Sequence, residues 1–268
     1  MNVLVTGGNG YIAKSIARYC NTQFNLDIVT RAECNLEDRK SVDLFMQNKE
    51  YDCVIHTAIA GGSRLKDDES SVVFKNVSMV QNLLRHKNKF NRFINIGSGA
   101  SIWMPDTPYG MSKQIIEKYV GELDEGFTLN VYGVFDEYEL DTRFIKANIK
   151  RYIKKEPLSI HCNKYMSFFY MKDFINLLQQ YVALDVNHLS KVIDCCYDKT
   201  YSLHEIASDM INKLSDYSVP ILETKNDEVE YYCGIKVPRS VAPANFIGIH
   251  KGIIETYKAL LETQLKTE

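Results

Sequence analysis

Short apolar runs alternate with helical periodicity along the first half of the chain. Asn2–Thr6 is an apolar run of strand length, and Ile12, Ile16 and Ala17 repeat at the spacing of one helix face. The same alternation continues through further strands and helices, namely strands at Leu26–Thr30, Cys53–His56, Phe93–Ile96 and Thr128–Tyr132 and helices at Val72–His86 and around Tyr109. This pattern predicts an α/β fold, a doubly wound parallel sheet with helices on both faces.

The pattern changes beyond residue 133. Ser202 is a good helix N-cap because Glu205 follows three residues later, as in a capping box. The other elements expected in this half are helices at Arg143–Lys155, Lys172–Ala183 and Gly252–Leu265 and strands at Leu158–His161 and Val192–Cys195. We therefore expect one domain over residues 1–134, to which 165–197 return, and a smaller C-terminal lobe over 135–164 and 198–268.

A glycine motif follows the first strand directly. Gly7, Gly10 and Ala13 are spaced G-x-x-G-x-x-A, a variant of the dinucleotide fingerprint. The first glycine permits the tight turn, the second lets the backbone approach a pyrophosphate, and the helix N-terminus favours the negative charge. The motif predicts a Rossmann domain over 1–134 and cofactor contacts at Gly7, Gly10, Tyr11 and Ile12.

The end of the second strand indicates which dinucleotide binds. A site specific for NAD places Asp or Glu there to hold the ribose hydroxyls, but this strand ends in Thr30 and Arg31. The guanidinium of Arg31 suits a 2′-phosphate, which favours NADP(H) as the cofactor. Glu33 lies close by. If the strand runs two residues longer, Glu33 becomes the ribose ligand and NAD is favoured.

Tyr109 and Lys113 stand four residues apart in the string YGMSK, so they share one face of a helix. An ammonium beside a phenol lowers its pKa, because opposite charge favours the ionised form. Tyr109 could then exchange a proton with a carbonyl or an alcohol. Alone, this spacing is more typical of a solvated helix face than of a catalytic pair. Here the strings GGNG, TAIAGG, GSGAS and YGVFD all lie where strands end, which is where ligands gather in such folds.

Composition narrows the class of protein. The chain of 268 residues has a formal net charge of −2, which gives no reason to expect nucleic acid or an acidic membrane as a partner. Its seven cysteines follow no C-x-x-C spacing, so no zinc site is expected. With no signal peptide and no apolar run long enough to span a bilayer, we expect a cytoplasmic enzyme.

Taken together, these motifs resemble the extended short-chain dehydrogenase/reductase family, in particular its nucleotide-sugar epimerases and reductases, nearly from end to end. TGGNGYIA, HTA, YGMSK, NVYG, FFYMKD and SLHEIA each resemble a segment of that family. The resemblance implies catalytic roles for Ser98, Tyr109 and Lys113. It also implies contacts to the cofactor and to the substrate from the residues Leu36, Ala58, Ala60, Asn76, Tyr109 and Lys113 (cofactor) and Ser98, Gly99, Asn130, Arg143 and Lys164 (substrate).

Within the family, the pattern most resembles GDP-L-fucose synthases and other nucleotide-sugar 4-keto reductases, which implies reduction with NADPH. Fucose synthases also epimerise two carbons, using a cysteine and a histidine, whereas this chain has Ala100 and, by a looser alignment, Arg143 at those positions. Neither can act as the base, so we expect a simple reductase. Many relatives grip the diphosphate with an arginine where this chain has Met166, which leaves Lys164 or Arg143 to bind it and the nucleotide open.

Two other functions stay open at this point. One is a nucleotide-sugar 4-epimerase, or an epimerase-reductase, that uses NAD. The other is a non-catalytic NADP(H)-binding regulator, although relatives of that kind usually lose the tyrosine or the lysine. The family often dimerises through the helix of Tyr109, so the resemblance implies a homodimer.

Overall fold

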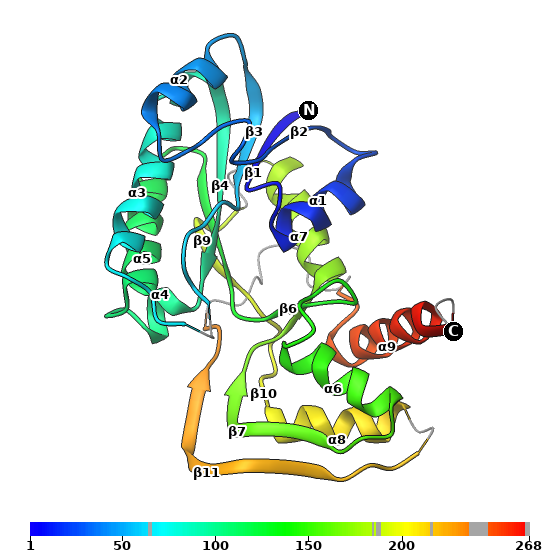
Figure 1. Ribbon diagram of the computed structural model, residues 1–268. Coiled ribbons are helices and arrows are strands. Elements are labelled where there is room, and N and C mark those ends of the chain that lie inside the picture. The colour runs from blue at the N-terminus through cyan, green and yellow to red at the C-terminus, as the bar shows by residue number, and fades with distance from the viewer. Residues whose placement is uncertain (64–65, 184, 186–188, 215–216, 236–245, 266–268) are drawn as a thin grey trace. The chain divides into compact units, whose positions relative to one another are not determined.

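The computed structural model describes residues 1–63, 66–183, 185, 189–214, 217–235 and 246–265 (Figure 1). The chain divides into two compact units. The first comprises Met1–Val131 and Ile175–Asp194, and the second comprises Tyr132–Phe174 with the described parts of 195–268. No helix in the described part of the chain combines the length and the apolar character that crossing a membrane requires.

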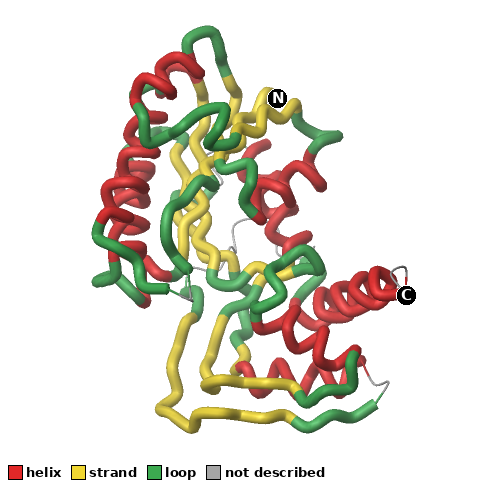
Figure 2. The backbone as a smooth tube through the Cα atoms, viewed as in Figure 1, coloured by secondary structure: helices red, strands yellow, loops and turns green. Residues whose placement is uncertain are grey.

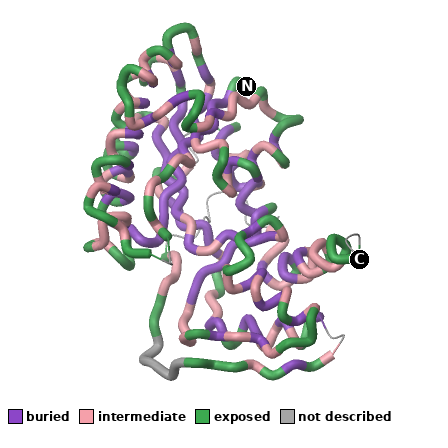
Figure 3. Tube along the Cα trace, viewed as in Figure 1, coloured by how far each residue is buried: buried purple, intermediate pink, exposed green. Residues whose placement is uncertain are grey.

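The first unit is built on a sheet whose six strands, within the described residues, follow the order β2-β1-β3-β4-β5-β9. They are β1 (Asn2–Thr6), β2 (Asn25–Val29), β3 (Tyr51–His56), β4 (Phe90–Ser98), β5 (Gly126–Val131) and β9 (Val192–Cys195). Strands β1 to β5 pair in parallel. The side chains of β1, β3, β4 and β5 are mostly buried on both faces of the sheet, as is typical of parallel strands (Figure 3). Those of the edge strand β2 are mostly half-buried.

Helices cover both faces of this sheet. In Figure 1, α2, α3 and α5 lie on one side of the strands, and α1 and α7 lie on the other. The bounds are α1 (Tyr11–Cys20), α2 (Arg39–Met46), α3 (Ser71–Leu84), α4 (Ala100–Trp103), α5 (Pro108–Gly121) and α7 (Met171–Ala183), with a 3₁₀ turn at Lys87–Lys89. The predicted doubly wound α/β fold is confirmed.

The second unit has its own core. Among the described residues it contains a three-stranded sheet of order β10-β7-β11 and a β6-β8 pair (Figure 2). Its elements are β6 (Val134–Phe135), α6 (Phe144–Ile153), β7 (Leu158–Met166), β8 (Phe169–Tyr170), β10 (Tyr201–Ser202), α8 (Leu203–Leu214), β11 (Ile221–Tyr232) and α9 (Ile249–Leu265). Tyr152, Leu158, Phe168 and Ile253 are among the residues that fill its core.

The N-terminus of α8 contains the predicted capping box. The Ser202 backbone N–H donates to the Glu205 carboxylate over 2.7 Å, and the Glu205 N–H donates to the Ser202 hydroxyl over 3.1 Å. These two bonds pair N–H groups that the helix itself cannot pair, so the local sequence fixes where α8 begins.

The unit boundaries differ slightly from the expected domain limits. The first unit ends at Val131 rather than at residue 134, and it regains the chain at Ile175–Asp194 rather than at 165–197. The reason is packing, because Phe168 and Tyr170 join the hydrophobic core of the second unit. The expected lobe at 198–268 includes residues 215–216, 236–245 and 266–268, which lie outside the described residues.

Candidate active site

The turn between β1 and α1 brings two chain segments into close contact. Gly7 has a φ of +73°, and a Cβ there would lie 2.8 Å from the backbone of Ala58. The Gly10 N–H donates to the Gly7 carbonyl over 2.8 Å and closes the turn. Tyr11 and Ile12 are the first residues of α1 and stand at the positive end of its dipole. Glycine at position 7 is therefore required by both conformation and space.

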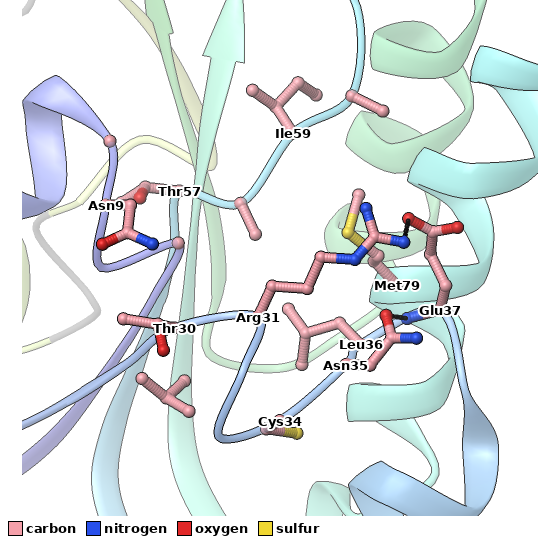
Figure 4. A pocket seen from close by; sticks show the side chains of 15 residues that line it. Asn9, Thr30, Arg31, Cys34, Asn35, Leu36, Glu37, Thr57, Ile59 and Met79 are labelled. Atoms are coloured by element: carbon pink, nitrogen blue, oxygen red, sulfur yellow. Dashed lines mark hydrogen bonds and ion pairs between the residues drawn. The ribbon is translucent and has the colours of Figure 1, made fainter.

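A cavity of about 310 Å³ lies beside this turn (Figure 4). Its wall comes from the glycine turn, the loop after β2, the segment after β3 and Met79 of α3. Six of the residues predicted to contact the cofactor line it, namely Gly7, Gly10, Arg31, Leu36, Ala58 and Ala60. Its volume is at the lower end of the range for small-molecule sites, and apolar side chains beside a helix N-terminus suit an adenosine with its phosphates.

The loop after β2 brings opposite charges to this cavity. Strand β2 ends at Val29, and the Glu33 carboxylate accepts hydrogen bonds from the Thr30 N–H and hydroxyl, both over 2.8 Å. These bonds lower the pKa of Glu33. Glu33 therefore does not extend the strand, and it is not on the cavity wall.

Arg31 is on the wall, and its guanidinium forms an ion pair with Glu37 over 3.0 Å. The sequence motifs did not single out Glu37, since it lies outside the strand and the fingerprint.

Asn76 braces the cavity wall from α3 without lining it. Its amide oxygen accepts the Ala60 N–H over 2.7 Å, and its amide nitrogen donates to the Ala60 carbonyl and to the Ser112 hydroxyl, both over 3.0 Å. Ser112 in turn donates to the Tyr109 carbonyl over 2.7 Å. One fully buried side chain thus joins the segment after β3 to the helix of Tyr109.

We predict that Asn76→Ala lowers the free energy of unfolding by about 3 kcal/mol, because three hydrogen bonds are lost and buried partners stay unpaired. Urea denaturation measures this. Asn82→Ala is the matched control, since Asn82 is on the same helix and its amide makes one such bond, to the Leu36 carbonyl over 2.9 Å. A cost for Asn76→Ala no larger than that of the control would contradict the bracing role.

The predicted catalytic residues come from β4 and α5 of the first unit. Ser98 is buried at the end of β4, where its hydroxyl accepts the Ala100 N–H over 3.2 Å. Tyr109 is half-buried in the first turn of α5, and its ring packs against Gly62 so closely that a Cβ there would lie 2.7 Å from the ring. The Lys113 ammonium lies 5.7 Å from the centre of the same ring.

Lys113 is buried with one strong hydrogen bond. Its Nζ donates to the Ile96 carbonyl over 2.7 Å, and only 5% of the residue is exposed. Burial disfavours the charged form and lowers the pKa of Lys113 to about 7. The lysine can therefore change its protonation state near neutral pH, and an anion bound beside it would favour the ammonium.

His56 holds the segment after β3 through Thr6. The Thr6 hydroxyl accepts the N–H groups of Thr57 and Ala58 over 3.2 and 3.3 Å, and it lies 3.0 Å from the His56 Nδ1. Because its acceptor sites are used, the hydroxyl donates to Nδ1, which must then be unprotonated. Burial, with a smaller contribution from the charge of Lys113, lowers the pKa of His56 to about 3.

We predict that His56 makes the fold sensitive to acid. From about pH 6.5 down to about pH 3, the unfolded chain binds a proton at His56 that the folded chain does not, so stability falls as the pH falls. The loss has a slope of at most about 1.4 kcal/mol per pH unit. In urea denaturation, His56→Gln should show a smaller decline than the wild type over this window. His86→Gln, which removes a histidine paired with Asp43, is the control, and parallel declines for wild type and His56→Gln would refute the assignment.

The residues predicted to bind substrate are divided between the two units. Gly99 donates its N–H to the Val131 carbonyl over 3.0 Å. Asn130 is buried, and its amide nitrogen lies 3.2 Å from Glu117 and 3.3 Å from Asp194, so its donor is directed at two carboxylates. Arg143 is the half-buried N-cap of α6 in the second unit. Lys164, also in the second unit, lies 3.6 Å from Glu230.

Comparison with known proteins shows the family of the chain. The family model described as the NAD dependent epimerase/dehydratase family matches residues 3–189. No match is found among curated proteins.

Solved structures share the fold at low sequence identity. A UDP-glucose 4-epimerase from Thermotoga maritima has a TM-score of 0.78 and 14% identity, covering 98% of this chain and 100% of the other. A GDP-L-fucose synthetase from Naegleria fowleri has a TM-score of 0.78 and 14% identity, with 98% and 94% covered. A GDP-mannoheptose C4 reductase from Campylobacter jejuni with NADP bound has a TM-score of 0.77 and 14% identity, with 97% and 98% covered.

Proposed function

The chain belongs to the NAD dependent epimerase/dehydratase family, and on this premise we propose that it reduces the 4-keto group of a nucleotide-linked 4-keto-6-deoxy sugar with NADPH, for the synthesis of surface-polysaccharide precursors. One observation carries the proposal. The segment after β3 lines the cavity with Ala58 and Ala60 and then packs Gly62 against the ring of Tyr109. One short segment of chain therefore contacts both the proposed proton donor and the proposed dinucleotide pocket.

The residues of the first unit fit a nicotinamide dinucleotide. Gly7 and Gly10 let backbone approach a pyrophosphate at the N-terminus of α1, and Leu36 and Ala58 give the cavity its apolar wall. Arg31 supports NADP(H), because its guanidinium can bind a 2′-phosphate. When bound, the dinucleotide supplies the hydride.

The protein's own residues donate the proton and stabilise the charge that remains. The Tyr109 hydroxyl donates its proton to the carbonyl oxygen as that oxygen becomes an alcohol, and the Ser98 hydroxyl donates a hydrogen bond to the same oxygen. Lys113, when protonated, stabilises the phenolate that remains. The resemblance also implies that Lys113 holds the nicotinamide ribose, and the dinucleotide phosphates would favour its charged form.

At the two positions where fucose synthases have the cysteine and the histidine used in epimerisation, this chain has Ala100 and, by a looser alignment, Arg143. Ala100 is buried at the start of α4, and Arg143, the N-cap of α6, carries a guanidinium, which has no acceptor site. Neither can remove a proton from carbon. We therefore expect no deuterium at C3 or C5 of the product after turnover in D₂O, as read by mass spectrometry. Incorporation there would exclude a simple reductase.

A 4-epimerase that uses NAD is the second candidate. The ion pair between Arg31 and Glu37 favours it, because an arginine held by a carboxylate is less available to a 2′-phosphate. The fold is also shared with a UDP-glucose 4-epimerase. Epimerisation at C4 regenerates the cofactor in each cycle, so net oxidation of NADPH distinguishes the two activities. A non-catalytic regulator is disfavoured because the chain keeps Tyr109 and Lys113.

The nucleotide of the substrate stays undefined. Met166, which occupies the position where many relatives have an arginine, is buried in the core of the second unit and cannot contact a diphosphate. Arg143 and Lys164 are the cations proposed to take that role. Lys164 would bind as a point charge and must leave Glu230 to do so.

We also propose a homodimer formed through α3 and α5. Phe74 of α3 is 75% exposed, and Met111 and Tyr119 of α5 are exposed as well. Burying such side chains is favourable, and a closed twofold contact buries the same residues of both protomers. Sedimentation equilibrium that gives a monomer at micromolar concentration would refute this.

The decisive experiment follows the absorbance of NADPH, and separately of NADH, with GDP-, dTDP-, CDP- and UDP-linked 4-keto-6-deoxy sugars. Oxidation of NADPH with one of them supports the reductase and identifies its nucleotide. No oxidation across the panel, in protein that binds the cofactor, would refute the proposed reductase and favour the 4-epimerase.

A further inference from the structure

We propose that Glu37 weakens the preference of this pocket for NADP(H), by competing with the 2′-phosphate for the guanidinium of Arg31. The inference rests on the proposed function, since it assigns the cavity beside the glycine turn to the adenosine half of a nicotinamide dinucleotide. It adds a residue that acts against the NADP(H) preference expected from Arg31 alone.

The geometry places both side chains on one wall. Arg31 and Glu37 both line the cavity, and Figure 4 shows the guanidinium extending across it to the Glu37 carboxylate. The two atoms of the ion pair, an Arg31 terminal nitrogen and the Glu37 Oε1, are 3.0 Å apart. The Arg31 side chain is 72% exposed, whereas that of Glu37 is only 23% exposed. The carboxylate is thus the more buried partner and the guanidinium the more exposed one.

The backbone around Glu37 is held by local hydrogen bonds. The Glu37 N–H donates to the Asn35 side-chain oxygen over 3.3 Å. The next residue, Asp38, is the N-cap of α2 and accepts the Lys40 N–H over 3.0 Å. Glu37 therefore stands between a local turn and a capped helix, which hold its backbone at the cavity wall.

Opposite consequences follow for the two cofactors. A 2′-phosphate carries nearly two negative charges, so Glu37 repels it and also withholds a donor that it needs. A ribose 2′-hydroxyl carries no charge and can donate a hydrogen bond to a carboxylate. Glu37 therefore opposes NADP(H) and tolerates NAD(H), while Arg31 has the opposite effect. With both present, the pocket should discriminate weakly between the two.

Binding to the intact chain tests this without turnover. Dissociation constants are measured for NADPH and NADH by fluorescence, and for adenosine 2′,5′-bisphosphate and adenosine 5′-monophosphate by calorimetry. Glu37→Gln should tighten the two ligands with a 2′-phosphate about fivefold, the order of an exposed ion pair, and should leave the other two unchanged or weaker. In Arg31→Gln, adding Glu37→Gln should give much less gain, because the competed group is gone.

Glu33→Gln is the matched control. It removes the same charge from the same loop, but Glu33 is bonded to Thr30 and is not on the cavity wall. An equal gain from Glu33→Gln would show a general charge effect and overturn the proposal, as would an unchanged NADPH to NADH ratio in Glu37→Gln. If the wild type binds none of the four ligands, the proposed function itself fails, which is a distinguishable result.

Discussion

Tyr109→Phe is expected to lower kcat by about 10³-fold while leaving the dissociation constant of the cofactor unchanged. Proton transfer by a positioned side chain contributes about 10² to 10⁴ to a rate, and phenylalanine has no proton to give. The substitution removes one oxygen and keeps the ring, so the packing against Gly62 persists. We expect NADPH oxidation to stop or to slow strongly. NADPH binding, measured by fluorescence, should stay intact.

A matched control makes this outcome specific. Tyr119→Phe removes a hydroxyl from the same helix, at an exposed position where that hydroxyl accepts a hydrogen bond from Gln81. It should keep turnover near the wild-type value. If Tyr109→Phe also keeps it, Tyr109 is not the proton donor. If cofactor binding is lost as well, the substitution has disturbed the pocket and the catalytic role is not supported.

The local sequence predicts most of the helices and strands of the first unit. The observed β1 has the predicted bounds because its apolar run is ended by Gly7, whose positive φ stops a strand. Likewise α8 begins where Ser202 and Glu205 predicted, since those two side chains pair the backbone at the helix end. Such signals are encoded within a few residues, and they need no knowledge of the rest of the fold.

Other features depend on partners far away in sequence or on side-chain geometry. Strand β11 is rich in charged residues in ILETKNDEVEYY, and its sequence does not predict a strand, because its pairing with β7 decides its structure. The short helix α2 was also missed. The pairing of Arg31 with Glu37 could not be read from the strand end, since it depends on how the loop after β2 turns back. Asn130 shows the same limit, because the motif predicts substrate contact while its amide nitrogen is directed at Glu117 and Asp194.

Lys113→Met should separate the stability cost of the buried lysine from its catalytic value. Turnover should fall by about 10²-fold or more, because the phenolate of Tyr109 loses its nearby charge. Methionine fills a similar volume and avoids burying an amine, although the Ile96 carbonyl loses its donor, at a cost of about 1–3 kcal/mol that does not depend on pH.

The pH dependence of the difference between the two proteins identifies the lysine. The unfolded wild type binds a proton at Lys113 below about pH 10.5, whereas the folded protein does so only below about pH 7. Between these values the unfolded state holds more protons, so the stability of the wild type relative to Lys113→Met rises with pH, by at most about 1.4 kcal/mol per unit. Urea denaturation of the cofactor-free proteins at pH 7 and pH 9 measures this rise.

Lys118→Met reports the effect of removing an exposed lysine from the same helix. A flat difference between wild type and Lys113→Met would mean that Lys113 keeps an ordinary pKa. The ammonium would then be fully charged throughout this range, and the activity should show no ionisation of this group near neutrality.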